Sequence, residues 1–340
     1  MADFEKRARR YPTDLTDEEW TLILPFLPPV AARGRKPATN LRDVLDALRY
    51  LARTGGGWRM LPNDFPPWQT VYWWFRRFVR HLLLRTIHDV ALMLDRERQA
   101  REQSPSAAVV DSQSIKAPMA QKRGYDAGKK VLGRKRHIAV DTDGRLLMVN
   151  LTTADISDSA GAQAIVAAIR KRWPWLKHLF ADGAYDRTRL MDAAAYQDFV
   201  LEIIRRTDKQ AGFKVLPKRA VVERTFGWMT RWRRLVRDYE QRIDVSEAMI
   251  HVALGSLMLR RIAHPYRCWQ LRALLAAVLG LIAELLRQTT ASCESYAEER
   301  PLFAGNACRA RYVRALSRPR RQMPRCGVTD HRLGWRRGRA

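Results

Sequence analysis

Three acidic residues in a strongly basic chain are of the type that binds divalent metal ions. Asp111 lies in a short β-branched run, Asp182 ends the apolar segment KHLFAD, and Glu223 is the single acid in the arginine-rich stretch RAVVERTFGWMTRWRRL. Carboxylate oxygens suit Mg²⁺ or Mn²⁺, and two such ions about 3.5–4 Å apart can hold the attacking and leaving oxygens of a phosphodiester. The alternative for Glu223 is an ordinary ion pair with neighbouring arginines.

Strands are expected to position the first two acids. The run AAVVDSQSI predicts a strand that contains Asp111, and KRHIAVDTDGRLLMVNLTT predicts two strands around a tight turn at Asp143 and Gly144. KHLFAD and FVLEIIRR predict two further short strands. Asp182 closes the first of these, and the ends of strands are where α/β sheets place their ligand sites.

Helices are expected between and after these strands. DSAGAQAIVAAIRKRW predicts a helix that begins at Ser157 or Asp158, residues 188–196 predict a second, and the arginine-rich stretch predicts a third. The order of elements indicates a mixed α/β fold, in which three antiparallel strands are continued by parallel ones.

The last of these helices carries Glu223. At helical spacing, Glu223 shares one face with small, polar and cationic residues, namely Gly227, Thr230, Arg231 and Arg234. A helix stabilised only by salt bridges would more often scatter several acids among its arginines. The pattern therefore favours a chemical role for Glu223.

Other acids crowd the same region of the sequence. We assign Asp143 to its turn, Asp158 to a helix cap, and Asp186 to the cap of the helix that follows it. Asp155 stays open as a further site residue.

Residues from about 14 to 95 read as helical. LTDEEWTLILPFLP begins at a Thr/Asp cap signal, NLRDVLDALRYLART is followed by Gly55, and PPWQTVYWWFRRFVRHLLL begins another helix. One interpretation is a relative of the helix-turn-helix motif that reads DNA. The other is a three-helix bundle whose core is filled by its aromatic residues Trp68, Tyr72, Trp73 and Phe75.

The charge of the chain indicates a polyanionic partner. Among 340 residues, 62 are lysine or arginine and 35 are aspartate or glutamate, which gives a formal net charge of +27. Such a surplus is typical of proteins that bind nucleic acid, because each phosphate contact releases condensed counterions. The charge indicates the class of partner but not the reaction.

The C-terminal residues differ in composition from the rest. Residues 264–340 contain all four cysteines, no C-x-x-C pair, many arginines and no lysine. We expect neither a disulfide framework nor a zinc site, and interpret this segment as an appended basic extension, poorly packed or disordered. Its apolar run, residues 271–286, is interrupted by Arg272 and Glu284. With no secretory signal at the N-terminus, we expect no membrane span and a cytoplasmic location.

Several motifs together resemble one family. VVDSQSIKA, RGYDAGKKVLGRKRHIAVDTDG, ADGAYD and VVERTFGW occur in the order found in the DDE transposases of bacterial insertion sequences, in particular the insertion-sequence-five family. The resemblance runs from about residue 11 to about residue 262. It implies an RNase H-like mixed sheet flanked by helices (residues 101–263), preceded by an all-α domain (residues 1–100) that binds DNA ends.

The resemblance also implies a site and a reaction. The catalytic and metal-binding acids would be Asp111, Asp182 and Glu223, holding two Mg²⁺ or Mn²⁺ ions. The enzyme would cut double-stranded DNA at the terminal inverted repeats of a transposon and join the 3′-hydroxyl to target DNA. Bridging two ends would require a homo-oligomer, a dimer or larger.

Basic residues near these acids are expected to contact phosphates. In the loop of residues 116–136 they are Lys129, Lys130, Lys135 and Arg136, and around Glu223 they are Arg219, Arg231 and Arg234. Arg219 matches an arginine that relatives carry four residues before the glutamate. Thr230 stands where relatives carry a lysine, and Arg231 beside it is expected to take that role.

Two other functions remain open at the level of the sequence. An RNase H-like nuclease without strand transfer would use the same three acids. A non-catalytic DNA-binding regulator would need only the N-terminal helices, and its acids would tolerate amide replacement.

Overall fold

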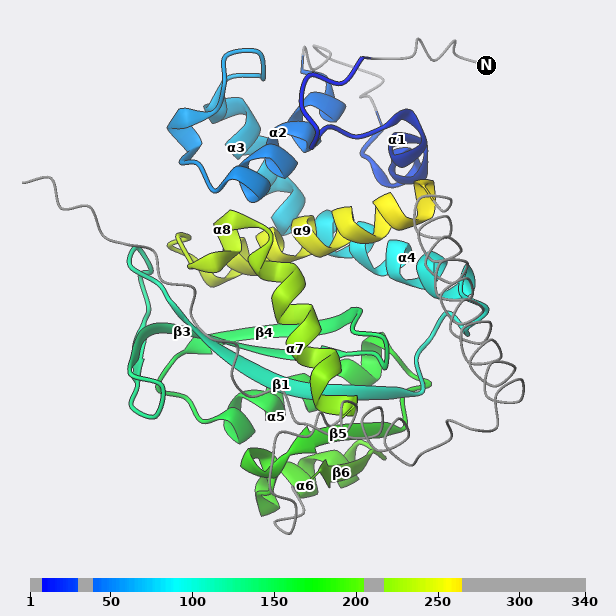
Figure 1. Ribbon diagram of the computed structural model, residues 1–340, viewed down its shortest axis with the longest axis vertical. Helices are drawn as coiled ribbons and strands as arrows, with labels where there is room; N and C mark the ends of the chain where they lie inside the picture. Colours follow the sequence, from blue (N-terminus) through cyan, green and yellow to red (C-terminus); the bar gives the residue numbers. More distant parts are fainter. Residues whose placement is uncertain (1–7, 30–38, 205–216, 265–340) are drawn as a thin grey trace, which may run out of the picture. The chain divides into compact units, whose positions relative to one another are not determined.

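A sheet with both antiparallel and parallel strands forms the centre of the described structure (Figure 1). The computed structural model describes residues 8–29, 39–204 and 217–264, without the side chains of residues 217–219. Within these residues the sheet has six strands in the order β2-β3-β1-β5-β6, and β4 also pairs with β3. The strands are β1 (Ala107–Lys116), β2 (Gly124–Asp126), β3 (Val131–Val140), β4 (Leu146–Thr153), β5 (His178–Asp182) and β6 (Val200–Ile204).

The pairing of the strands confirms the predicted mixed sheet. β3 is antiparallel to both β1 and β4, whereas β5 is parallel to both β1 and β6. β2 was not predicted, since its three residues lie within the segment interpreted as a basic loop. Gly133 of β3 pairs with Lys116 of β1 on one side and with Gly124 of β2 on the other. β2 and β4 therefore both pair with β3 on the side away from β1.

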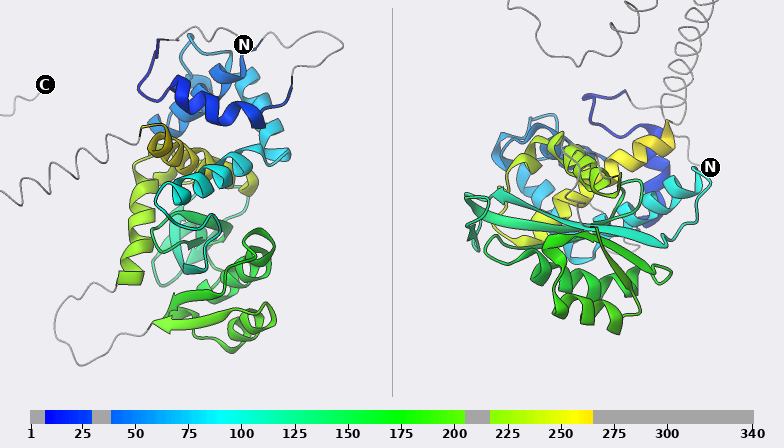
Figure 2. Two further views of the ribbon diagram at one scale, coloured as in Figure 1. Left: turned by 90° about the vertical axis from the view of Figure 1, so that its right-hand side faces the viewer. Right: turned by 60° about the horizontal axis from the view of Figure 1, so that its bottom comes forward.

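Helices cover both faces of the sheet. α5 and α6 lie on one face and α7 on the other (Figure 2). The described helices are α1 (Asp17–Ile23), α2 (Leu41–Thr54), α3 (Trp68–Arg80), α4 (Leu83–Glu97), α5 (Asp158–Arg172), α6 (Thr188–Tyr196), α7 (Pro217–Thr230), α8 (Arg233–Val236) and α9 (Ile243–Ala263), with short 3₁₀ turns η1 (Leu24–Phe26), η2 (Trp58–Met60) and η3 (Gly183–Tyr185).

Local signals explain the ends of the N-terminal helices. Thr16 and Glu19 form a reciprocal capping box at the start of α1, and the Asn40 side chain caps α2. α2 ends at Gly55, whose φ of 79° is a left-handed conformation that glycine adopts without strain. Residues 55–67 separate α2 from α3, a longer connection than the three or four residues of a helix-turn-helix.

The aromatic residues of α3 only partly fill a core. Phe75 is fully buried, and Trp68 and Tyr72 pack against the buried cluster. Trp73 is 51% exposed, so the prediction that it fills a core is wrong. Its ring is covered by the Arg77 guanidinium, which lies 5.6 Å from the ring centroid.

The predicted hairpin between β3 and β4 is confirmed. The Asp141 amide donates to the Arg145 carbonyl, and Gly144 between them has a φ of 87°. α7 binds the same turn, because the Thr225 hydroxyl donates to the Gly144 carbonyl and Arg224 donates to the Asp143 carbonyl. The turn thus connects the sheet to the helix that carries Glu223.

α9 links the N-terminal helices to the sheet. It packs along α4 and also contacts α2 and β4, and most of its residues are buried. All described residues belong to one compact unit with one continuous cluster of buried apolar side chains. The division at residues 100/101 and 263/264 therefore stays a prediction, and the extension with its cysteines lies outside the described residues. No helix in the described part of the chain is long and apolar enough to cross a membrane.

Candidate active site

Asp111 and Asp182 occupy equivalent positions on neighbouring parallel strands. Val109 of β1 pairs with Phe180 of β5, and each aspartate lies two residues further along its own strand. Side chains two residues apart project to the same face of a strand, and adjacent strands lie about 4.8 Å apart. The register of β1 and β5 therefore brings these two carboxylates to one face as neighbours.

The cross-strand partner of Ser112 shows which face this is. Ser112 pairs with His137 of β3, so the two side chains project to the same face. The Ser112 hydroxyl donates to Asp158 of α5 at 2.7 Å, and the His137 ring lies against Gly161 of α5. Asp111, next to Ser112 along the strand, projects to the opposite face.

α7 covers that opposite face (Figures 1 and 2). It packs against β1 through side chains at helical spacing, since Val222, Phe226 and Met229 are all buried. Glu223 follows the first of these and is exposed. All three predicted acids thus belong to one side of the sheet, two on adjacent strands and one on the helix above them.

The three carboxylates do not form a closed metal site by themselves. Among the described residues, no three acidic, histidine or cysteine side chains gather closely enough to hold an ion. The aspartate pair supplies hard oxygen donors on neighbouring strands, which is the chemistry that Mg²⁺ or Mn²⁺ requires. The donors fit such an ion in kind.

Tyr185 is a site residue that the sequence analysis missed. Its side chain is buried, and its hydroxyl interacts with Ser112, although not as a hydrogen bond of regular geometry. Burial raises the pKa of this phenol well above its ordinary value, and the nearby carboxylates of Asp111, Asp158 and Asp182 raise it further. A neutral hydroxyl therefore lies among three acids. The signal in the sequence was the tyrosine of ADGAYD, three residues after Asp182.

Asp158 has a different role from the predicted cap. The cap of α5 is Ser157, whose hydroxyl accepts from the Ala160 amide, whereas Asp158 accepts from Ser112 and pairs with Lys135 at 3.0 Å. Its pKa is lowered: burial raises it, but the bonds from Ser112 and Lys135 outweigh burial. The predicted cap at Asp186 is also wrong, because α6 begins after Arg187 without a side-chain cap.

Lys135 is held inside this network on the α5 side of the sheet. Its ammonium group donates to the Ile156 carbonyl at 2.8 Å and lies 3.5 Å from Asp126. The Asp126 pKa is lowered to about 2, first by the hydrogen bond from Ser114. Lys135 is only 6% exposed, so its position does not favour the predicted contact with DNA.

Two predicted phosphate contacts are likewise buried. Arg136 is 2% exposed, and burial lowers its pKa to about 10. Arg234 donates to Glu240 at 2.6 Å and to the Gly56 carbonyl at 2.5 Å. These bonds hold Arg234 in the interior, and the role of both arginines as DNA contacts stays a prediction that burial disfavours.

The remaining predicted contacts reach solvent or lie outside the described side chains. Lys129, Lys130 and Arg231 are exposed, and Arg219 belongs to α7 but its side chain lies outside the described residues. The predicted continuous helical face is wrong, because α7 ends at Thr230 and α8 begins at Arg233. Glu223, Gly227 and Thr230 keep their shared exposed face.

Comparisons with known proteins agree with the order of the motifs. Residues 102–258 match the family model described as "Transposase DDE domain", and residues 15–88 match "Putative transposase of IS4/5 family". The "Uncharacterized protein y4sN" of Sinorhizobium fredii (strain NBRC 101917 / NGR234) is 33% identical over 103 residues, which are 30% of this chain and 76% of that protein.

Two relatives come from Burkholderia cepacia. The "Insertion element IS402 uncharacterized 16.2 kDa protein" is 36% identical over 134 residues, 37% of this chain and 84% of that protein. The "Putative transposase for insertion sequence element IS402" is 31% identical over 128 residues, 35% of this chain and 59% of that protein.

Proposed function

The chain belongs to the DDE transposases of the IS4/5 family, and we propose that it cuts DNA at the ends of an insertion sequence and joins the freed 3′-hydroxyl groups to target DNA. The observation that carries this proposal is the equivalent placement of Asp111 and Asp182 on β1 and β5. The antiparallel β1, β3 and β4 followed by the parallel β5 and β6 support an RNase H-like core.

The residues of this chain would divide the work between them. Asp111 and Asp182 would bind two Mg²⁺ or Mn²⁺ ions from the strands, and Glu223 would complete the ligands from α7. When bound, such ions would offset negative charge on the phosphate oxygens and lower the pKa of a water molecule. The water oxygen would bond to phosphorus as the bond to the 3′-oxygen breaks; the water loses one proton and the 3′-oxygen takes one up, which leaves a 3′-hydroxyl. The oxygen of that hydroxyl would then bond in line to a target phosphorus as the bond from this phosphorus to the target's own 3′-oxygen breaks, and the released 3′-oxygen takes up a proton, without a covalent enzyme intermediate.

Partners follow from this reaction. The substrates are the terminal inverted repeats of the element and the target duplex, and exposed cations such as Lys129, Lys130 and Arg231 are proposed to contact their phosphates. Joining both ends at one target requires at least two copies of the chain. The cytoplasm, where bacterial DNA lies, is the compartment that this function requires.

Amide substitutions of the aspartates test the proposal. Purified Asp111→Asn and Asp182→Asn variants are incubated with a duplex that carries the element's own ends, with Mg²⁺ or Mn²⁺. We expect both to bind the duplex as the wild type does but to cut no DNA, because an amide is a poor ligand for a hard cation. Asp192→Asn, an exposed acid on α6, is the matched control and should cut normally.

The same assay separates the alternatives. Wild-type cleavage without joined products on target DNA would assign the chain to RNase H-like nucleases. If the wild type cuts no DNA, or if the amide variants cut at the wild-type rate, the catalytic proposal is overturned and a DNA-binding regulator is favoured.

A further inference from the structure

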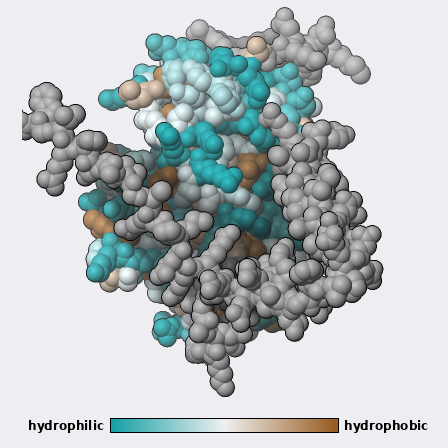
Figure 3. Space-filling model, viewed as in Figure 1, coloured by the Kyte–Doolittle hydropathy of each residue, from teal (hydrophilic) through white to brown (hydrophobic). Residues whose placement is uncertain are grey.

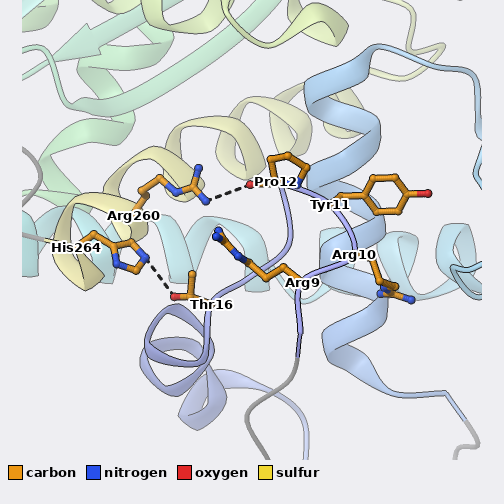
Figure 4. Close-up of a pocket in the computed structure, with 7 residues that line it drawn as sticks. All are labelled: Arg9, Arg10, Tyr11, Pro12, Thr16, Arg260 and His264. Atoms are coloured by element: carbon orange, nitrogen blue, oxygen red, sulfur yellow. Dashed lines mark hydrogen bonds between the residues drawn. The ribbon is translucent and has the colours of Figure 1, made fainter.

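A cleft with basic walls lies between the N-terminal segment and the end of α9 (Figure 4). Its volume is about 730 Å³, and it is lined by Arg9, Arg10, Tyr11, Pro12, Thr16, Arg260 and His264. A second cavity of about 530 Å³ shares Tyr11, Pro12 and Arg260 and continues to α2 and the C-terminal end of α7, where Arg49, Arg53, Trp228, Arg231 and Trp232 line it. The two together are here named the arginine cleft.

One buried carboxylate pairs with two of the arginines that line the arginine cleft. Glu19 is fully buried, and it pairs with Arg49 at 2.8 Å and with Arg260 at 3.5 Å. Among the described acids, none lies within ion-pair distance of the exposed side chains of Arg9, Arg53 or Arg231. In the view of Figure 3, the part of the face that is not grey is a mixture of hydrophilic and hydrophobic residues. The cleft therefore keeps a surplus of positive charge after its internal pairs are counted.

The guanidinium groups crowd one another. The pKa of Arg260 is lowered mainly by burial; Glu19 has the next largest effect and raises it, and the like charges of Arg49 and Arg9 lower it further. Fixed cations held together in this way lower the affinity of each for its proton. A bound anion would relieve that repulsion.

Aromatic rings hold the arginines in place. The Arg53 guanidinium lies 5.6 Å from the Trp232 ring centroid and donates to the Arg231 carbonyl at 2.7 Å. Arg261 and Arg224 lie 4.5 Å and 5.4 Å from the Trp228 ring centroid. Since these ring faces are covered by guanidinium groups, the cleft favours forked contacts to phosphate over the stacking of nucleobases.

We infer that the arginine cleft binds the phosphate backbone of DNA next to the catalytic face, through Arg9, Arg53 and Arg231. The inference rests on the proposed function, which makes DNA the ligand. α7 carries Glu223 seven residues before its last residue, Thr230, which is about 10 Å along a helix and about three steps of 3.4 Å along a DNA strand. A duplex whose scissile phosphate lies at the acids would thus place phosphates a few steps away at the cleft.

The salt dependence of binding tests the inference. The triple variant Arg9→Gln, Arg53→Gln, Arg231→Gln and the wild type are titrated with a duplex of unrelated sequence at increasing salt concentration. Each lost phosphate contact should reduce the slope of log K against log salt by about 0.9. Arg189→Gln, an exposed arginine on α6, is the matched control and should keep the wild-type slope. A triple variant with the wild-type slope would overturn the inference.

Two further measurements separate this result from misfolding and from the catalytic proposal. Arg53→Lys keeps the charge and should keep most of the slope, and all variants should unfold at the wild-type temperature because the three side chains are exposed. Asp111→Asn should bind DNA without cutting it. Cutting by Asp111→Asn would refute the catalytic role and leave the salt slopes as an independent result.

Discussion

The His137 ring lies directly against Gly161 of α5, so that a Cβ added to the glycine would stand 2.1 Å from the ring. The ring is fully buried and donates to or accepts from the Thr152 hydroxyl at 2.9 Å, so it has no room to move aside. This contact sets how closely α5 approaches the sheet. It therefore also sets the position of Asp158, one helical turn earlier.

We expect Gly161→Ala to destabilise the fold by about 1–3 kcal/mol, the usual range for overpacking a core. Unfolding by urea, followed by circular dichroism, measures the difference. Gly227→Ala is the matched control on α7, where nothing lies within 4 Å of the added Cβ. It should gain up to about 1 kcal/mol from helix propensity. Equal urea midpoints for Gly161→Ala and the wild type would contradict the close contact.

The buried pair of Arg134 and Asp238 leads to a second stability prediction. Arg134 is fully buried and donates to Asp238 at 2.8 Å and to the Ser246 hydroxyl at 3.1 Å. Asp238→Ala leaves this guanidinium without its counter-charge, so we expect a loss of about 3–5 kcal/mol in the free energy of unfolding.

Two comparisons check that prediction. Replacing both partners, Arg134→Met with Asp238→Leu, should recover part of the loss because no buried charge remains. Arg242→Ala removes an exposed partner of Asp244 and should change the thermal midpoint little. A thermal midpoint of Asp238→Ala equal to that of Arg242→Ala would contradict a stabilising role for the buried pair.

Tyr185→Phe separates stability from activity. The buried hydroxyl interacts with Ser112 without a hydrogen bond of regular geometry, so its removal should lower the thermal midpoint little. We expect cleavage to slow by roughly tenfold, about 1.4 kcal/mol in activation free energy, because the hydroxyl near the Asp111 and Asp182 carboxylates is lost. A fall in the midpoint together with normal cleavage would show that the hydroxyl supports folding and not the site.

The stability of the protein should fall as the pH drops below 6.5. Burial lowers the His137 pKa from 6.5 to about 4, with smaller effects of Asp158, Lys135 and Lys129. As the pH falls, His137 is protonated near pH 6.5 in the unfolded chain but only near pH 4 in the folded protein. The free energy of unfolding is therefore unaffected by this histidine above pH 6.5 and decreases between pH 6.5 and about 4. The loss is at most about 1.4 kcal/mol per pH unit.

Comparison with His137→Asn isolates this effect. Burial raises the Asp46 pKa to about 6, which acts in the opposite direction at lower pH, but equally in both proteins. Urea unfolding at a series of pH values should therefore show a shallower fall for the variant between pH 6.5 and 4, and a constant difference above pH 7. Parallel curves throughout would rule out a buried, neutral His137.

Much of the fold could be predicted from the sequence because its signals are local. The capping residues Thr16 and Ser157, the helix end at Gly55 and the turn at Gly144 each act through bonds to residues at most four positions away. Local signals misled where competing partners lie far along the chain. Asp158 was predicted as a cap, but Ser112, 46 residues earlier, takes its carboxylate.

The three acids could be named from the sequence because their motifs keep a characteristic order, but whether Asp111 and Asp182 lie side by side is decided by the register of β1 and β5. That register depends on contacts between residues about 70 positions apart, which no local propensity encodes. Burial is decided in the same way: Lys135 and Arg231 are both cations in basic segments, yet only the fold surrounds Lys135 with Asp126 and Asp158 and leaves Arg231 exposed. Sequence determined which groups are present, and tertiary packing, through long-range pairing and desolvation, determined which of them can reach DNA.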